Sequence, residues 1–343
     1  FRQHYAAKAK KAKRIAGAIR GVELLTGPLP VKYGTKLYMA LVDPHLTHGA
    51  DVLLDTVDAA LRELEKVQLL YIRRMLGLNG RSRTFVLFTE TGLLPLRSRR
   101  LSLAIRFVLY VLRSPGLLVS SAYREMVSLD FAGHRTWVGQ LREAVRKLPY
   151  ACAMPDHNGL LSVERMEELL HDVVSGVGPW LQGLVDASPR LSLIHGRCEP
   201  DATGELTARV PMALRQYLRV ANPGPRRALT RVLLSEHKYA TRMLRWTHPG
   251  ARCLCRFCGT ESETVEHLWL WCRGSDSLSV ARRRFMVNIW KSASVAERAD
   301  LESKNDDAPT QLKALLSGRK WVAIAAEFAY DIERLVEKVP VRI

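Results

Sequence analysis

The sequence has no long hydrophobic run, few cysteines and little acidic charge. No stretch approaches the roughly 18 apolar residues that are needed to span a bilayer. The first residues are basic and lack the apolar core of a signal peptide. These features argue against a membrane or secreted protein. We therefore read the six cysteines as reduced thiols and expect an intracellular protein without a membrane partner.

Acidic residues are outnumbered, and the imbalance is uneven. The chain has 52 lysines and arginines against 34 aspartates and glutamates, a formal charge of +18. Residues 1–100 carry 18 basic against 8 acidic residues, while residues 209–256 carry 11 basic residues against Glu236 alone. Two basic blocks favour a polyanionic partner, most simply RNA or DNA. A basic surface that serves only solubility is the alternative.

Four of the six cysteines lie within 20 residues of one another. Cys255 and Cys258 form a C-x-x-C pair, eight residues separate Cys258 from His267, and four more precede Cys272. Thiolates and a neutral imidazole are the ligands that tetrahedral zinc prefers. The spacing predicts one structural zinc ion on these four side chains, with no open position for hydrolysis. Two alternatives stay open: Cys253 replaces Cys255, or the thiols bind no metal.

Apolar residues recur at helical spacing along most of the chain, which predicts a mainly α fold. With 343 residues the chain exceeds one typical core, so several subdomains are expected. The only candidate for a β-hairpin lies within 189–211, and residues 300–304 read as a polar linker. The main expected helices are 3–25, 31–54 with a bend at Pro44, 56–77, 96–113, 119–129, 135–148, 162–186 in two pieces, 223–246, 263–271, 276–294, 309–317 and 319–338.

Basic residues gather on three of these helices. Those on 3–25 could follow a phosphate backbone, or form a solvated face or a localisation signal. Arginines crowd the first turn of 96–113, where the helix dipole disfavours cations, so an anionic ligand would relieve the mismatch there. The helix 223–246 presents a charged face directly before the zinc segment. The candidate nucleic-acid-binding residues are Lys8, Lys10, Lys11, Lys13, Arg14, Arg97, Arg99, Arg100, Arg226, Arg227, Arg231, Lys238, Arg242 and Arg245.

Aromatic residues accompany the zinc segment. Phe257, Trp269 and Trp271 could stack on unpaired bases, as aromatic side chains do in proteins that bind single strands. Small metal-held modules more often use such residues as their core. We expect at least one of the two tryptophans to be buried.

Several segments resemble the region after the palm in non-LTR retrotransposon reverse transcriptases: KLYMALVDPHLTHGADVLL (36–54), LRELEKVQLLYIRRMLGL (61–78) and ETGLLPLRSRR (90–100). RRALTRVLLSEHKYATRMLRW (226–246), followed by the four zinc ligands, is similar to the arginine-rich helix and Cys-Cys-His-Cys segment at the C-terminal end of that family. The resemblance covers about half the chain. It implies thumb helices that grip a template–primer duplex and a zinc end that binds element RNA or target DNA.

The family's catalytic motif has no counterpart here. Polymerase chemistry needs paired aspartates that hold two metal ions, in the family an aromatic-x-Asp-Asp turn between strands. This chain has only Asp306 and Asp307, within the polar stretch SKNDDAP. We therefore expect no enzymatic activity from this chain alone, no small-molecule substrate, and a nuclear location. Because Phe1 already lies in a helical pattern, we expect a fragment, with the missing palm and fingers as a further partner.

These observations divide the chain into four predicted regions. A thumb-like helical region spans 1–115, and a helical linker region spans 116–222. The basic helix and a zinc module of ββ/α or knuckle-like form span 223–273, and a C-terminal helical tail spans 274–343. A rival interpretation is a zinc-stabilised protein-interaction scaffold or an inactive retroelement remnant, in which zinc and charge serve only folding and solubility.

Overall fold

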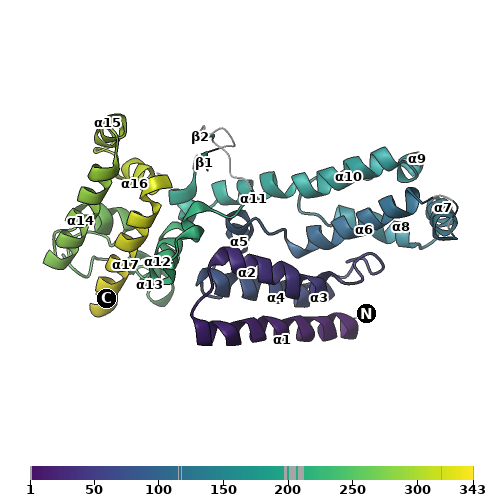
Figure 1. The fold of residues 1–343 in the computed structure, drawn as a ribbon, viewed down its shortest axis with the longest axis horizontal. Helices are drawn as coiled ribbons and strands as arrows, with labels where there is room; N and C mark the ends of the chain where they lie inside the picture. Colours follow the sequence, from purple (N-terminus) through teal and green to yellow (C-terminus); the bar gives the residue numbers. More distant parts are fainter. Residues whose placement is uncertain are drawn as a thin grey trace. The chain divides into compact units, whose positions relative to one another are not determined.

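A computed structural model describes residues 2–114, 116, 118–196, 199–200, 206–207, 212–317 and 319–342. Within these residues the protein is mainly helical, which confirms the predicted fold class (Figure 1). The chain forms two compact units. Unit 1 comprises Phe1–Gly27, Gly34–Ile72 and Leu87–Leu184. Unit 2 comprises Pro28–Tyr33, Arg73–Val86 and Val185–Ile343.

Residues 2–186 contain eleven α-helices among the described residues, several of which begin in one unit and end in the other. They are α1 (Arg2–Thr26), α2 (Val31–Leu37), α3 (Asp43–Thr47), α4 (Asp58–Leu76), α5 (Thr84–Thr91), α6 (Leu96–Leu112), α7 (Leu118–Phe131), α8 (Trp137–Arg146), α9 (His157–Leu160), α10 (Val163–Ser175) and α11 (Val177–Asp186). The predicted helix 31–54 is shorter and consists of α2, a π-helical turn at Tyr38–Val42, and α3. The turn lies just before Pro44, whose ring and missing N–H disturb a regular helix.

The core of unit 1 lies among α6, α7, α8, α9 and α10. Its apolar residues include Val108, Val127, Leu141 and Met166, which have no exposed surface. Helices α6 and α10 run side by side (Figure 1). The core joins helices on both sides of residue 115, a boundary between two of the predicted regions. The four-region division stays a prediction.

Unit 2 contains the remaining helices and a pair of very short strands. They are a 3-10 turn at Pro189–Ile194, β1 (Glu199–Pro200), β2 (Leu206–Thr207), a 3-10 turn at Gln216–Arg219, α12 (Pro223–Leu233), α13 (Ala240–Thr247), the π-helical turn η4 (His267–Trp271), α14 (Asp276–Ser292), α15 (Val295–Ser303), α16 (Ala308–Ser317), a 3-10 turn at Arg319–Trp321 and α17 (Val322–Lys338). β1 and β2 pair antiparallel. The predicted hairpin region therefore holds strands, but residues 189–194 form a 3-10 turn instead of the first strand.

Two further predictions for unit 2 are wrong. The basic helix 223–246 is broken into α12 and α13, and Ser235 between them has a left-handed backbone with φ of 56°. Residues 300–304 belong mostly to α15 and not to a linker. The signal for α15 is a capping box, in which the Ser294 hydroxyl accepts from the Glu297 amide and the Glu297 carboxylate accepts from the Ser294 amide.

Aromatic side chains form the centre of unit 2, where α12 and α14 both pack on α17. Trp269 is fully buried, and its ring centroid lies 5.8 Å from that of Phe285 and 5.0 Å from that of Phe328. Trp269 is thus a core residue, as expected for at least one tryptophan of the segment, while Trp271 is half exposed. Among the described residues, no helix has both the length and the apolar content to cross a membrane.

Candidate metal centre

The four predicted zinc ligands come together in unit 2. One donor atom from each of Cys255, Cys258, His267 and Cys272 lies within 4.8 Å of every other. The Sγ atoms of Cys255 and Cys272 are 3.6 Å apart, and Cys258 Sγ is 3.4 Å from His267 Nε2. Metal–sulfur and metal–nitrogen bonds of ~2.3 and ~2.1 Å in a tetrahedron place such atoms ~3.8 and ~3.6 Å apart. The geometry therefore fits a metal ion bound by four protein ligands.

A short turn presents the first two cysteines. Leu254 and Ser262 form an isolated antiparallel bridge, and the Cys255 amide donates to Glu261 O at 2.7 Å. The Gly259 amide closes the turn by donating to Cys255 O at 2.8 Å. Gly259 has φ of 72°, a left-handed conformation that glycine adopts without steric cost. This turn brings both thiols to the same side.

The other two ligands lie at the ends of η4. His267 is the first residue of this π-helical turn, and Cys272 follows its last residue. The Cys272 amide donates to His267 O at 2.8 Å, which bends the chain back towards the first pair. Gly274 then passes against the C-x-x-C turn so closely that a Cβ there would lie 2.4 Å from the Cys258 nitrogen.

Helix α14 fixes the end of η4 through one arginine. The Arg282 guanidinium donates to Leu268 O, Trp269 O and Cys272 O at 2.8, 2.8 and 2.9 Å. These carbonyls belong to the last turn of the segment, which has no helical partners for them. Arg282 therefore positions Cys272 without contributing a donor atom to the cluster. No spacing in the sequence signals this role.

A carboxylate orients the histidine. Glu261 Oε2 accepts from His267 Nδ1 at 2.8 Å, which leaves Nε2 as the atom directed at Cys258. Metal-bound histidines commonly donate their second ring nitrogen to a carboxylate, which fixes the tautomer and raises ligand basicity. This role of Glu261 was not predicted from the sequence. Its only signal is a glutamate six residues before the histidine.

The cysteines differ in how readily they ionise. Burial raises the pKa of Cys255 to about 12, and it also raises the pKa of Cys272. At Cys258 burial acts in the same direction, but hydrogen bonds from the Thr260 hydroxyl and from the amides of residues 260 and 261 outweigh it and lower the pKa to about 6. Cys253 lies outside the cluster, with its Sγ 3.7 Å from Ala251 O. Cys255 and not Cys253 therefore completes the cluster.

A buried ion pair joins the segment to its neighbours. Glu263 has no exposed surface and lies 2.8 Å from the Arg256 guanidinium, and its carboxylate also accepts from the Ala240 amide at the start of α13. Arg256 donates in addition to Val336 O and Val339 O near the end of α17, at 2.7 and 2.8 Å. The metal cluster is thus connected through one pair of charges to α13 and α17.

The basic residues of α1 are mostly exposed. Lys10, Lys11, Lys13 and Arg14 lie on the solvent side of the helix, and Lys8 is half-buried and donates to His48 O. The exposed four lie within five consecutive residues and are interrupted only by the buried Ala12. They are free of the strong internal contacts that occupy the arginines of α6.

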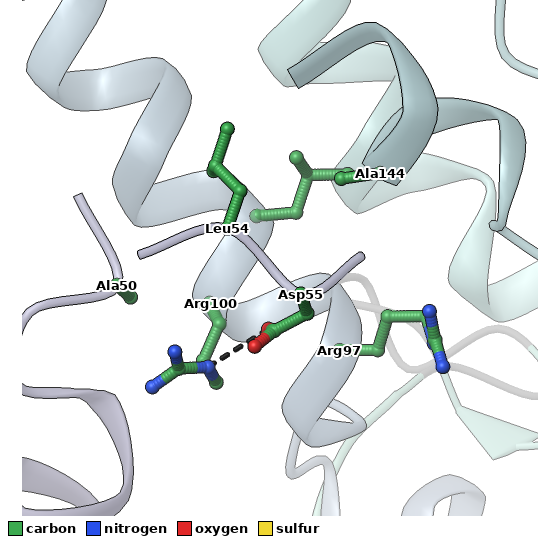
Figure 2. A pocket seen from close by; sticks show the side chains of 7 residues that line it. Ala50, Leu54, Asp55, Arg97, Arg100 and Ala144 are labelled. Carbon is green, nitrogen blue, oxygen red and sulfur yellow. Dashed lines mark hydrogen bonds and ion pairs between the residues drawn. The ribbon is translucent and has the colours of Figure 1, made fainter. Parts of the chain in front are cut away.

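Arg100 is a structural residue, and its prediction as a nucleic-acid contact is wrong. Its side chain is 1% exposed and donates to Asp55 Oδ2 at 2.8 Å, to Leu46 O at 2.6 Å and to the Tyr5 hydroxyl at 3.2 Å. Figure 2 shows the guanidinium directed at the Asp55 carboxylate beside a cavity of about 10 Å³. The anion predicted for the first turn of α6 is here an aspartate of the protein itself.

The neighbouring arginines are also paired with aspartates of the protein. Arg97 lies 2.6 Å from Asp58, and Arg99 lies 3.3 Å from Asp43. The Arg97 side chain is 19% exposed and that of Arg99 is 30% exposed. Both carry an internal counter-ion, so the mismatch with the helix dipole does not require an external ligand.

The arginines of α12 are also largely engaged within unit 2. Arg226 is 2% exposed and donates to Val220 O and Ala221 O at 2.7 and 3.0 Å, so its prediction as a nucleic-acid contact is wrong. Arg227 is half-buried. Arg231 lies 2.5 Å from Glu333 of α17. Sequence alone cannot separate these residues from surface cations, because the carboxylates and carbonyls that they bond are distant along the chain.

Beyond α12 the charges become more accessible. Lys238 is about half exposed and pairs with Glu337. Arg242 is 14% exposed and lies 3.1 Å from Glu236, while Arg245 is exposed on the same helix, α13. These three residues remain candidates for contacts with an anion.

Comparison with known proteins gives no match. The chain matches no protein-family model, no curated protein and no solved structure. The functional conclusion therefore comes from the cluster and from the charges of the two units: unit 2 holds three thiols and an imidazole in an arrangement that could bind a metal ion.

Proposed function

We propose that this protein is a zinc-stabilised nucleic-acid-binding unit, the C-terminal part of a reverse transcriptase of the non-LTR retrotransposon type. The observation that carries the proposal is the cluster of Cys255, Cys258, His267 and Cys272, which follows a basic pair of helices in the order found in that family. The thumb-like segments belong to α2 through α6. Binding of template and target nucleic acid is assigned to the exposed cations of α1 and α13.

Zinc is the metal that best suits the donors. Three thiolates with one imidazole form a soft set, and a tetrahedral arrangement of such ligands is typical of structural zinc sites. Four protein ligands leave no position for a substrate or water, so the ion supplies folding energy and no hydrolysis. The carboxylate of Glu261 at the second ring nitrogen of His267 supports this assignment.

The polymerase centre is assigned to a palm and fingers outside this chain. Asp306 and Asp307 lie in the turn between α15 and α16, and Asp307 accepts from the Thr310 hydroxyl at 2.5 Å. Neither residue lies on a strand. A pair of catalytic metal ions needs carboxylates fixed together on a rigid element. In this proposal the present chain binds nucleic acid and the absent part performs synthesis.

One observation favours the rival interpretation as a protein scaffold. Arg100 and Arg226 use their charge inside the fold, and Arg97, Arg99 and Arg231 have carboxylate partners. A share of the formal charge therefore stabilises helix packing instead of facing a partner. The two functions differ in what the exposed lysines of α1 and the arginines of α13 do: they contact nucleic acid in the first and only keep the protein soluble in the second.

The proposal is tested by salt-dependent binding to structured RNA and to duplex DNA. The variant Lys10→Glu/Lys11→Glu/Arg14→Glu reverses three exposed charges of α1. Each lost phosphate contact is expected to reduce the slope of log K against log salt by ~0.7–0.9. The matched control Arg124→Glu/Arg135→Glu/Arg146→Glu reverses three exposed charges of unit 1 that were not predicted to bind.

The expected result is a weaker, less salt-dependent complex for the α1 variant and a smaller effect for the control. Arg100→Ala is a second control, because it should lower stability without changing the slope. Absence of binding by the unaltered protein at low salt would contradict the proposal. Equal effects of both triple variants would show that only net charge matters.

A further inference from the structure

Four arginines of unit 2 line one open groove. Arg83 precedes the start of α5, Arg190 belongs to the 3-10 turn at Pro189–Ile194, and Arg242 and Arg245 lie on α13. The groove has a volume of about 400 Å³. Arg83 and Arg245 are exposed, and Arg190 and Arg242 are half-buried. The fold thus brings together cations from three separate segments of the chain, and Arg83 and Arg190 are not among the residues predicted from the sequence to bind nucleic acid.

Among the described residues, four guanidinium groups and one carboxylate, that of Glu266, line this groove. Arg242 bonds Glu236 at 3.1 Å. Burial lowers the pKa of Arg190, and the charges of Arg245, Arg83 and Arg242 lower it further, while Glu236 acts in the opposite direction. Arg190 therefore lies close enough to the other three guanidinium groups to be repelled by them. An anion placed among them would relieve this repulsion.

Hydroxyl groups accompany the arginines. Ser192 and Ser235 line the same groove. Guanidinium forks bind phosphate oxygens with two parallel N–H donors, and hydroxyls add single donors of the kind seen along nucleic-acid backbones. Because the groove is open, it can accommodate a polymer that continues beyond both of its ends, whereas a small anion would not be enclosed by it.

The metal-held segment forms one wall of the groove. Thr264, Val265 and Glu266 line it and directly precede the candidate ligand His267. The Glu263 amide donates to Cys253 O and the Thr241 hydroxyl donates to Glu263 O, which joins this wall to α13. Loading of the metal site therefore helps to set the position of the wall relative to Arg242 and Arg245.

We propose that this groove holds the phosphodiester backbone of the bound nucleic acid, with Arg83 and Arg245 as its phosphate contacts. The inference rests on the proposed function and locates it within unit 2. It assigns the groove beside the metal-held segment a direct role in binding. The metal acts through the shape of the groove wall, and not through contact with the nucleic acid.

The test uses the exposed pair of arginines, because their replacement leaves buried contacts intact. Arg83→Gln/Arg245→Gln is compared with Arg219→Gln/Arg283→Gln, which removes two exposed arginines of unit 2 that do not line the groove. Binding to a duplex DNA and to a structured RNA is measured between about 0.05 and 0.2 M salt. At about 0.1 M salt two lost phosphate contacts are expected to weaken binding by roughly 25- to 60-fold and to reduce the slope by ~1.4–1.8.

A second measurement needs no variant. Arginine-selective modification of the unaltered full chain is followed by mass spectrometry, with and without nucleic acid. The proposal expects protection of Arg83 and Arg245 by nucleic acid, and no protection of Arg219 and Arg283. Poly-glutamate of matched charge serves as the competitor; equal protection and equal affinity would assign the groove to an acidic polypeptide and overturn the proposal.

The failures of the two proposals are distinguishable. If the unaltered protein binds and the groove variant has the affinity and slope of its control, this inference is wrong while nucleic-acid binding elsewhere on the chain stands. If the unaltered protein binds no nucleic acid at low salt, the proposed function fails and this inference fails with it. Unchanged thermal unfolding of both variants excludes a loss of fold as the cause of weaker binding.

Discussion

Individual arginine side chains have two distinct roles in this protein. Arg100, Arg226 and Arg256 are almost fully buried, and they bond carboxylates and backbone carbonyls within their own units. Arg83 and Arg245 are exposed at a groove. Composition sums both groups into one net charge, so it overstates the charge available to a partner. Only the three-dimensional positions of the aspartates, glutamates and carbonyls separate the two uses.

The metal ligands could be predicted from sequence because they lie close together in it. A C-x-x-C pair and a following histidine and cysteine need only a turn and one short helix to meet. Glu261, Arg282 and Gly274 support this site equally directly, yet none has a spacing rule that marks it. Their roles depend on backbone positions, which become known only with the fold.

Zinc affinity should depend on the side chain that orients a ligand and not on a cysteine that lies outside the cluster. Glu261→Ala removes the carboxylate that orients His267 and is expected to weaken zinc binding by about 10- to 100-fold. Cys253→Ser is the control and should leave affinity unchanged, since Cys253 lies outside the cluster. Competition with a chromophoric zinc chelator measures both. A large loss for Cys253→Ser would contradict the ligand assignment.

His237 predicts a pH dependence of stability. Burial, aided by the charge of Arg242, lowers its pKa to about 3, whereas an unfolded histidine titrates near ~6.5. The unfolded chain therefore takes up this proton first as the pH falls. The contribution of neutral His237 to stability is complete above pH ~6.5 and is lost between ~6.5 and ~3.

The variant His237→Gln should reduce the pH dependence of the unfolding free energy in this range. The expected difference is about 1.4 kcal/mol per pH unit, the value for one proton. Denaturant unfolding at several pH values between ~6.5 and ~4 measures it. Loss of metal at low pH affects both proteins, so it cancels in the comparison. Identical slopes would mean that His237 is accessible to protons in the folded protein.

Among the helices, the spacing of apolar residues predicts most of the segments, but it does not predict where they are interrupted. The break between α12 and α13 depends on Ser235 in a left-handed conformation, which apolar spacing does not signal. The π-helical turn lies just before Pro44, where the sequence predicts a bend, and α15 begins at a capping box on Ser294, a local signal that apolar spacing does not include. The extent of a long helix thus follows from the periodicity of its apolar residues, whereas its breaks depend on single residues and on tertiary contacts.

The close approach of Gly274 to the C-x-x-C turn gives a prediction for one loop. Gly274→Ala places a Cβ 2.4 to 2.6 Å from backbone atoms of Phe257 and Cys258, so the backbone has to move. We expect a destabilisation of about 1–3 kcal/mol with weaker metal binding. Gly21→Ala in α1 is the control, because nothing lies within 4 Å of the added methyl group. Unfolding curves of the metal-loaded proteins compare them; equal stability of both variants would contradict the proposed packing of this loop.

At the scale of the whole molecule, the two units have separate sources of stability. Unit 1 has an apolar core among α6 to α10, far from the metal ligands in the chain, whereas unit 2 combines an aromatic core with the metal cluster. A metal ion that binds only the folded state stabilises the unit that contains its site. Metal removal should therefore act on one unit.

Hydrogen exchange with and without a strong chelator measures this difference. We expect faster exchange after chelation in residues 251–273 and in α13, α14 and the end of α17, which bond to that segment. Exchange in α6, α8 and α10 should stay the same. Equal acceleration in both units would contradict separate stabilisation, and no change in either would show that the metal contributes nothing to folding.

The most direct measurement is the metal content of the unaltered protein, purified without chelators and analysed by elemental mass spectrometry. We expect about one zinc ion per chain, and loss of that ion in the variant Cys255→Ser/Cys258→Ser. X-ray absorption at the zinc edge should give three sulfur ligands and one nitrogen ligand. A protein that folds with no bound zinc, or that keeps its zinc after both cysteines are replaced, would rule out a structural zinc ion on these four side chains.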